Sequence, residues 1–279
     1  MSSTFGKFRL HGRSAVVTGG ATGLGYHMSK GLADAGANVL IAARRESVLR
    51  EAADRLNASL EGEGSVHWCA VDLGDRESVA HLAQHALSTF GSVDIYIGNA
   101  CQDFHEHVDN ISNEAIDRMM QVNISANVEL TRAFLPGMRA KRWGRFLFSS
   151  SATTVVTSPF EGCSMYTAVK GALNAFTRTL AVEVGHDNIT ANALILGFFV
   201  TDMVLHAQNH IGATQGKEAA RKFMEDFISM TALGRAGSPA ELEGLIQFLA
   251  SDAGSYVTGS NLVVDGGLSI MQRPNATSS

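Results

Sequence analysis

Short aliphatic or β-branched runs alternate along this chain with longer amphipathic stretches. The short runs predict seven strands, at Ser14–Thr18, Asn38–Ala43, Val66–Val71, Val93–Ile97, Arg145–Ser149, Thr190–Leu196 and Asn261–Val264. The longer stretches predict helices, among them His27–Ala35, Ser47–Leu60, Ser78–Phe90, Asn113–Met138, Met165–Val184 and Pro239–Ala250. This alternation is typical of a parallel sheet with helices on both faces, so we expect an α/β, doubly wound Rossmann fold.

The chain has no repeat, low-complexity tract or Pro/Ser-rich linker that would divide it. Its 279 residues, 45% of them hydrophobic, are enough for one large core, so we expect a single domain over residues 1–279. The segment Phe198–Met230 breaks the alternation after a strand whose carboxyl end should face a ligand, and we interpret it as a substrate lid. By composition, we expect the tail at 271–279 to be disordered.

Charge and apolar content exclude several classes of partner. There are 22 basic and 27 acidic residues and no basic run, which argues against nucleic acid. The apolar runs fall far short of the roughly 20 residues that span a bilayer, and the N-terminus lacks a secretory pattern. We therefore expect no membrane partner. The chain has an odd number of cysteines, Cys69, Cys101 and Cys163, which suits reduced thiols, so we expect a cytoplasmic protein.

A glycine-rich turn follows the first predicted strand directly and opens the first helix. Glycines in such a turn let backbone amides approach a pyrophosphate at a helix N-terminus, where the helix dipole favours anions. A glycine-rich turn alone is a weak signal, and its place between strand and helix strengthens it. The sequence therefore predicts a dinucleotide loop whose binding residues are Gly19, Thr22, Gly23, Leu24 and Gly25.

The second predicted strand ends in Ala43 and Arg44, where an NAD site usually carries a carboxylate. Nothing there repels a 2′-phosphate, and Arg44 offers it a charge-assisted contact, so NADP(H) is favoured and NAD(H) stays open. The alternative is that Arg44 simply begins a solvated helix. Asp72, with Leu73, ends the third strand and is placed to meet the adenine, although such an Asp also serves as a helix cap.

Tyr166 and Lys170 lie four positions apart at the start of a predicted helix and share one face. An ammonium beside a phenol favours the phenolate; lowering a tyrosine pKa by roughly 3 units needs about 4 kcal/mol. Tyr166 would then be the general acid and base of a carbonyl–alcohol conversion, with Ser151 bonded to the substrate oxygen. A surface tyrosine packed on a lysine stem is the alternative.

With these motifs together, the chain resembles the short-chain dehydrogenase/reductase family from about Leu10 to Leu268. The matching segments are Thr18–Gly25, Asn99-Ala100, Asn123, Ser151, Tyr166–Lys170, Gly234–Gly237, Phe248–Asp252 and Val264–Gly267. The resemblance implies that Asn123 holds a water in a proton relay with Lys170, that Lys170 contacts the nicotinamide ribose, and that Thr201 reaches the nicotinamide carboxamide. It also implies a homotetramer, or a homodimer, built through the two long helices.

Three positions depart from the family pattern. The usual Asn-Asn-Ala-Gly reads Gly98 to Cys101, which we expect to reshape the backbone beside the adenosine ribose. Leu196 replaces the proline before Gly197, a residue that we place beside the nicotinamide. Fifteen positions separate Ser151 from Tyr166, two more than is common, so we expect a longer loop at the pocket wall.

These features predict an oxidoreductase that acts on a secondary alcohol or ketone of moderate, partly apolar character. The predicted pocket draws on Ser151 and on Phe104, Phe160, Met165 and Phe198. Pairs such as His105 and His107 lack a third ligand, so we expect no metal site. Two alternatives stay open: an idle cofactor-binding regulatory or scaffold protein, and an enoyl reductase, against which the pairing of Ser151 with Tyr166 argues.

Overall fold

The computed structural model describes residues 4–157 and 161–271, without the side chains of residues 203 and 207. Seven parallel strands form one sheet in the order β3-β2-β1-β4-β5-β6-β7. The strands are β1 (Ser14–Thr18), β2 (Asn38–Ala43), β3 (Ser65–Ala70), β4 (Ile95–Gly98), β5 (Gly144–Ser151), β6 (Ile189–Leu196) and β7 (Asn261–Val264). The order reverses between β1 and β4, and in such sheets the ligand crevice lies at the carboxyl ends of these strands.

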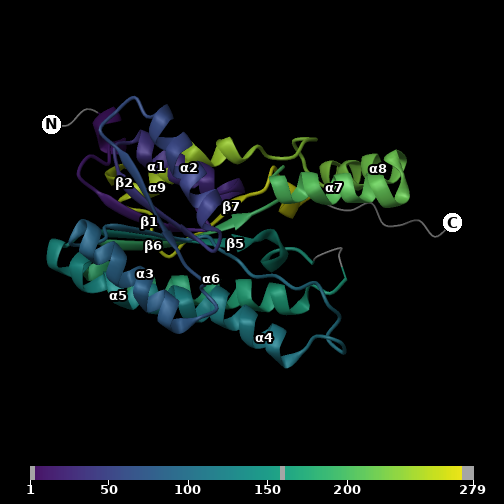
Figure 1. The fold of residues 1–279 in the computed structure, drawn as a ribbon, viewed down its shortest axis with the longest axis horizontal. Helices are drawn as coiled ribbons and strands as arrows, with labels where there is room; N and C mark the ends of the chain where they lie inside the picture. Colours follow the sequence, from purple (N-terminus) through teal and green to yellow (C-terminus); the bar gives the residue numbers. More distant parts are fainter. Residues whose placement is uncertain (1–3, 158–160, 272–279) are drawn as a thin grey trace.

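Helices cover both faces of the sheet, as Figure 1 shows, with α1, α2 and α9 on one face and α3, α5 and α6 on the other. Their bounds are α1 (Gly23–Asp34), α2 (Glu46–Ser59), α3 (Arg76–Phe90), α4 (Asn113–Met120), α5 (Ala126–Lys141), α6 (Ser164–Val184), α7 (Asp202–Gln215), α8 (Lys217–Ser229) and α9 (Glu243–Ala250). The doubly wound Rossmann fold predicted from the alternation is confirmed.

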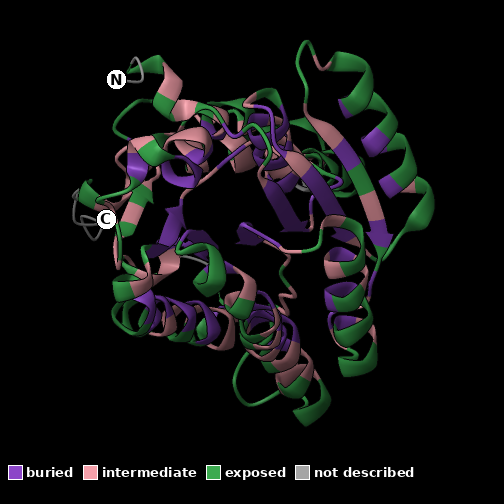
Figure 2. Cartoon of the chain, turned by 90° about the vertical axis from the view of Figure 1, so that its left-hand side faces the viewer, coloured by how far each residue is buried: buried purple, intermediate pink, exposed green. Residues whose placement is uncertain are grey.

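Each face of the sheet has its own hydrophobic core. Leu32, Leu56 and Leu249 lie in the core under α1, α2 and α9, whereas Leu82 and Phe134 belong to the core under α3 and α5. Every residue of β5 and of β6 is buried, because both faces of these strands are covered. Figure 2 shows the same distribution, with buried strands inside and exposed residues on the outer faces of the helices.

The stretch predicted as one helix, Asn113–Met138, is helical throughout, but it is not α-helical throughout. A π-helical turn, Gln121–Ser125, separates α4 from α5. Side chains bond the backbone at this turn: Asn123 Nδ2 donates to Met119 O at 2.9 Å, and Asn127 Nδ2 donates to Asn123 O at 2.8 Å. When amide side chains donate hydrogen bonds to helix carbonyls in this way, the helix can accommodate the extra residue of a π turn. The predicted span is therefore helical from end to end, and the sequence pattern missed only the π turn within it.

Helix α1 begins at Gly23, four positions before the predicted start at His27. Glycine is unfavourable in helix interiors, so the sequence pattern predicted that the helix begins after the glycine-rich turn. In the structure, the last residues of that turn are already helical. The segment predicted as a lid forms α7 and α8, joined at Gly216 with a positive φ of 97°. Figure 1 shows this pair extending beyond the end of the sheet. Among the described residues, no helix is both long and apolar enough to cross a bilayer.

Candidate active site

The glycine turn after β1 is shaped by close backbone approach. Gly19 and Gly23 have φ values of 66° and 53°, which side chains disfavour. A Cβ on Gly25 would lie 2.0 Å from Gly19 O, so only glycine fits there. Thr22, the N-cap of α1, makes no side-chain cap bond, which leaves first-turn amides of α1 for a ligand. The turn therefore fits the pyrophosphate of a dinucleotide.

Asn99 joins this turn to the neighbouring strands. Its Nδ2 donates to Thr18 O at 3.1 Å, and its Oδ1 accepts from Ser149 Oγ at 3.1 Å. Thr18 Oγ1 in turn accepts from the amides of Asn99 and Ala100, at 3.1 and 3.2 Å. These bonds connect the carboxyl ends of β1, β4 and β5, and they place Asn99 and Ala100 beside the predicted cofactor loop.

Lys170 lies on α6 and is 3% exposed. Its Nζ donates to the backbone oxygen of Ser149 at 2.8 Å and lies 5.8 Å from the centre of the Tyr166 ring. Both residues occupy the first two turns of the helix, so the face predicted from their spacing brings them together. The lysine ammonium is thus fixed at the end of β5, beneath the tyrosine.

The electrostatics of Tyr166 differ from the expectation that Lys170 favours its phenolate. Burial raises the pKa of Tyr166 above its usual range, and the neighbouring Cys101 and Asp103 raise it further. A hydrogen bond with Ser151 lowers this pKa, but by less than burial raises it. The protein's own groups therefore hold Tyr166 as a neutral phenol, which is a proton donor.

Ser151 ends β5 and is 9% exposed. Its Oγ accepts from the amide of Thr153 at 3.3 Å and from Thr153 Oγ1 at 3.2 Å. The Ser151 hydroxyl proton is thus directed toward Tyr166, so the two hydroxyl groups converge where a substrate oxygen could bind both. Strand β5 therefore positions two elements of the site, the Ser151 hydroxyl and the carbonyl that holds Lys170.

Asn123 lies in the π turn and is 1% exposed. Its Nδ2 donates to Gln102 O at 2.8 Å, so it fixes the loop after β4 as well as the turn. Within the described part of the chain, its buried Oδ1 has no hydrogen-bond donor. A buried acceptor without a donor is unfavourable unless another donor, such as water, binds it. This is compatible with the relay that the family resemblance implies.

Two predicted nicotinamide contacts also lie by the glycine turn or the end of β6. A Cβ on Gly23 would lie 3.5 Å from Thr201 Cγ2, so Thr201 borders the turn. A Cβ on Gly197 would lie 2.5 Å from the Cα of Asp265, so the close approach of the chain after β7 requires glycine there. Leu24 and Leu73 follow the ends of β1 and β3 and are partly and fully buried, respectively.

Arg44 and Asp72 follow the adjacent strands β2 and β3, as predicted for the adenosine end of the site. Sequence reasoning missed Arg118 of α4, whose Nη2 lies 2.6 Å from Asp72 Oδ1. Asp72 is not the N-cap of α3; Asp75 is, because its carboxylate accepts from the amides of Glu77 and Ser78. The helix-cap alternative for Asp72 is therefore wrong.

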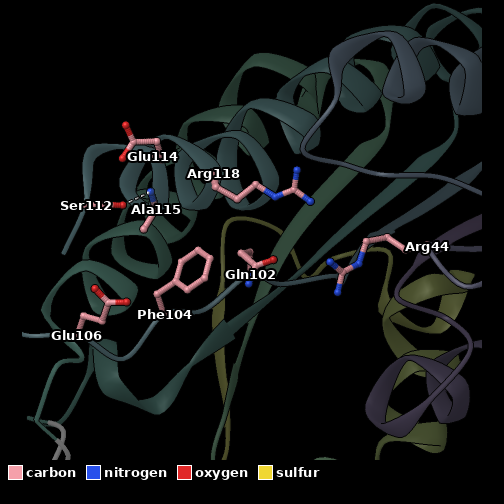
Figure 3. A pocket seen from close by; sticks show the side chains of 8 residues that line it. All are labelled: Arg44, Gln102, Phe104, Glu106, Ser112, Glu114, Ala115 and Arg118. Carbon is pink, nitrogen blue, oxygen red and sulfur yellow. Dashed lines mark hydrogen bonds between the residues drawn. The ribbon is translucent and has the colours of Figure 1, made fainter.

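The predicted substrate residues lie on different elements of the fold. Phe104 lines a cavity together with Arg44 and Arg118 (Figure 3), Met165 lies partly buried in the first turn of α6, and Phe198 stacks on Phe227 with 3.9 Å between ring centres. Phe160 lies outside the described residues. His105, which was not predicted as a site residue, meets the Tyr166 ring edge-on, with 6.2 Å between ring centres.

Gly98, one of the departures from the family pattern, has a packing role. A Cβ there would lie 2.0 Å from Asn127 Oδ1, which accepts from Tyr96 Oη at 2.7 Å. The missing side chain makes room for an asparagine on α5. Within the described ranges, no group of three or more His, Cys, Asp or Glu side chains is arranged to hold a metal ion.

A parallel sheet of this order with a glycine turn at its reversal point defines a dinucleotide-binding protein of the Rossmann type. A family model described as enoyl-(acyl carrier protein) reductase matches residues 19–269. A short-chain dehydrogenase/reductase from Aspergillus oryzae is 32% identical over 95% of this chain and 98% of its own. The chain therefore belongs to the short-chain dehydrogenase/reductase family.

Two solved structures show how closely the fold is shared. L-sorbose reductase from Gluconobacter frateurii, complexed with NADPH and L-sorbose, has 29% identity and a TM-score of 0.89 over 95% of this chain and all of its own (100%). A 3-oxoacyl-(acyl-carrier-protein) reductase from Agrobacterium tumefaciens with bound NADP has 28% identity and a TM-score of 0.83, covering 96% of this chain and 98% of its own.

Proposed function

We propose that this protein is an NADP(H)-dependent oxidoreductase that interconverts a ketone and a secondary alcohol, with Tyr166 as general acid and base. The observation that carries the proposal is the placement of Tyr166 between the hydroxyl of Ser151 and the ammonium of Lys170, with a pKa raised by burial. A protonated phenol and a second donor at one point suit the oxygen of a carbonyl substrate.

The residues divide the chemistry as follows. The nicotinamide, when bound, supplies the hydride for reduction of the carbonyl carbon, or accepts it in the reverse direction. Ser151 donates a hydrogen bond to the substrate oxygen and orients it. Tyr166 Oη gives its proton to that oxygen as the alcohol forms, and Lys170 stabilises the phenolate that remains. Asn123 holds the water through which this phenolate regains a proton.

NADP(H) is the cofactor that the adenosine end favours. Arg44 follows Ala43 at the end of β2, so a cation stands where a carboxylate would exclude a phosphate. The two similar reductases of known structure contain NADPH and NADP, which supports the same choice. The glycine turn would hold the pyrophosphate, and Thr201 and Gly197 would lie beside the nicotinamide.

We also propose a single domain with α7 and α8 as its substrate lid, in a homotetramer assembled through α5 and α6. The outer faces of α5 and α6 carry the exposed apolar residues Val128 and Val182, which are 37% and 78% exposed. Pairing of these helices about a two-fold axis, as the family resemblance implies, would cover both side chains.

The proposal is tested by turnover of a panel of ketones, secondary alcohols and α,β-unsaturated thioesters with NADPH and NADH. Tyr166→Phe keeps the ring and its volume, so we expect NADPH affinity to persist while kcat for the best ketone falls by about 10⁴ or more. Tyr256→Phe is the matched control, because Tyr256 is fully exposed at 102% and lies after α9.

The alternatives give different results in the same experiment. Turnover confined to the unsaturated thioesters would identify an enoyl reductase. Tight NADPH binding with no turnover of any substrate would favour an idle regulatory or scaffold protein. Retention of most ketone turnover in Tyr166→Phe would show that the proposed acid is wrong.

A further inference from the structure

Arg118 and Asp72 form an ion pair beside the predicted position of the cofactor's adenosine. Arg118 Nη2 lies 2.6 Å from Asp72 Oδ1, and the two side chains are 31% and 42% exposed. Arg118 belongs to α4 and Asp72 follows β3, so the pair connects elements that follow different strands. The pair is held at the rim of the site and remains open to a bound molecule.

The backbone beside Asp72 accommodates this arginine. A Cβ on Gly74 would lie 1.8 Å from Arg118 Nη1, so the guanidinium lies directly over that glycine. The amide of Gly74 also donates to Asp72 Oδ1, at 2.9 Å. One carboxylate oxygen therefore accepts from both Gly74 and Arg118, which holds the Asp72 side chain in one orientation.

Arg44 lies across the same cavity, whose volume is about 600 Å³. Figure 3 shows the guanidinium groups of Arg44 and Arg118 facing the space beside Gln102, whereas Glu106 and Glu114 lie toward the other end. Burial raises the pKa of Asp72, but the Gly74 amide, Arg118 and Arg44 together hold that pKa below its usual range. Arg44 is therefore close enough to interact with the Asp72 charge.

We propose that Arg118 determines the specificity of this site for a 2′-phosphate: it neutralises Asp72, so that Arg44 remains available to the phosphate of NADP(H). This inference rests on the NADP(H) preference proposed above. Without Arg118, the Asp72 carboxylate would lack its partner, would attract Arg44 and would repel a phosphate bound between them. An acidic residue at the end of β3 is thereby compatible with an anionic cofactor.

The test uses calorimetric titration of the cofactor-free protein with 2′,5′-ADP and 5′-AMP, which carry adenosine with and without the 2′-phosphate. The measured quantity is the ratio of their dissociation constants. We expect Arg118→Ala to reduce the preference for 2′,5′-ADP about tenfold and to change 5′-AMP affinity little. Arg118→Lys retains the charge and should retain most of the preference.

The double variant Asp72→Asn/Arg118→Ala separates a charge effect from loss of structure. It removes the carboxylate that Arg118 neutralises, so the preference for 2′,5′-ADP should return even where both affinities are lower. Arg139→Ala is the matched control, because Arg139 Nε lies 2.9 Å from Asp187 in another partly exposed ion pair between elements. Its ratio should equal that of the intact protein.

Three results would overturn the inference. Arg118→Ala with an unchanged ratio, or with equal losses for both ligands, would mean that Arg118 only anchors the loop after β3. A double variant with the same lowered ratio as Arg118→Ala would exclude the charge of Asp72 as the cause. If the intact protein bound both ligands equally, the proposed NADP(H) preference would fail together with this inference. The first two results would overturn only the role of Arg118, so the two failures can be told apart.

Discussion

The Nζ atom of Lys170 donates a hydrogen bond to the backbone oxygen of Ser149 at 2.8 Å, so a strand carbonyl holds the buried ammonium. A carbonyl orients the lysine without neutralising its charge, in contrast to a carboxylate. The side chain of the same Ser149 donates to Asn99 Oδ1. One residue of β5 thus connects the lysine to the asparagine that supports the glycine turn.

Replacement of Lys170 by methionine should abolish turnover and weaken NADPH binding. The change removes the cation that stabilises the Tyr166 phenolate and the proposed contact to the cofactor ribose. It also leaves Ser149 O without that donor, so unfolding free energy should fall by about 1–3 kcal/mol. Fluorescence titration with NADPH, kcat and urea denaturation measure the three effects. Lys30→Met, which removes a partly exposed partner of Asp34 on α1, serves as the control; a similar loss of turnover there would contradict the assignment.

The phenol of Tyr166 should remain protonated in the cofactor-free protein up to and beyond the ordinary tyrosine pKa of about 10, because burial raises its pKa. Because this pKa is raised, Tyr166 can donate a proton for reduction at neutral pH. It loses this ability only as the pH rises through the raised pKa. Ultraviolet difference titration of the intact protein against Tyr166→Phe checks this. A step between about pH 7 and 9 that disappears in the variant would contradict it.

Substitution of Gly98 by alanine should destabilise the protein by about 1–3 kcal/mol, because the new Cβ would lie 2.0 Å from Asn127 Oδ1. Asn127→Ala should itself be costly, since it removes bonds to Tyr96 Oη and Asn123 O. The double variant should cost less than the sum of the two, as the clash partner is gone. Urea denaturation of all four proteins gives this coupling, and strict additivity would refute the packing role of Gly98.

Light scattering should give four times the 29.6 kDa chain mass for the intact protein at micromolar concentration. Val182→Glu places a charge on the proposed interface face of α6 and should shift the mass to smaller species. Val108→Glu is the control, because Val108 is equally exposed, at 79% against 78%, and lies in the loop after β4. A monomer of the intact protein, or an equal shift by both variants, would exclude assembly through α6.

Much of the fold followed from the sequence because strands buried on both faces leave continuous aliphatic runs. The predicted bounds of β1 and β2, which are almost wholly buried, agree with the structure. Those of β7 agree as well, although its residues are exposed or partly buried. The π turn at Gln121–Ser125 could not be predicted, because it depends on side-chain bonds of Asn123 and Asn127 to helix carbonyls. Apolar periodicity contains no signal for such bonds.

In the site, the pairing of Tyr166 with Lys170 followed from their helical spacing, and the residues at strand ends followed from the topology. The ion pair of Arg118 with Asp72 did not, since it joins residues 46 positions apart. Gly74, four residues after the end of β3, was a possible signal, because a glycine can mark a close approach by another group. The sign of the Tyr166 pKa shift also depends on burial, which spacing alone does not predict.

Helices α7 and α8 pack mainly against each other, and stacking of Phe198 on Phe227 connects α8 to the chain that leaves β6. The pair is therefore a separate packing unit between β6 and the segment before α9. Its sequence can diverge without disturbing either core of the sheet, while Tyr166, Lys170 and the glycine turn stay on elements of the body. If the pair is the substrate lid proposed above, substitutions within it should change substrate preference and leave the proposed proton-transfer residues in place.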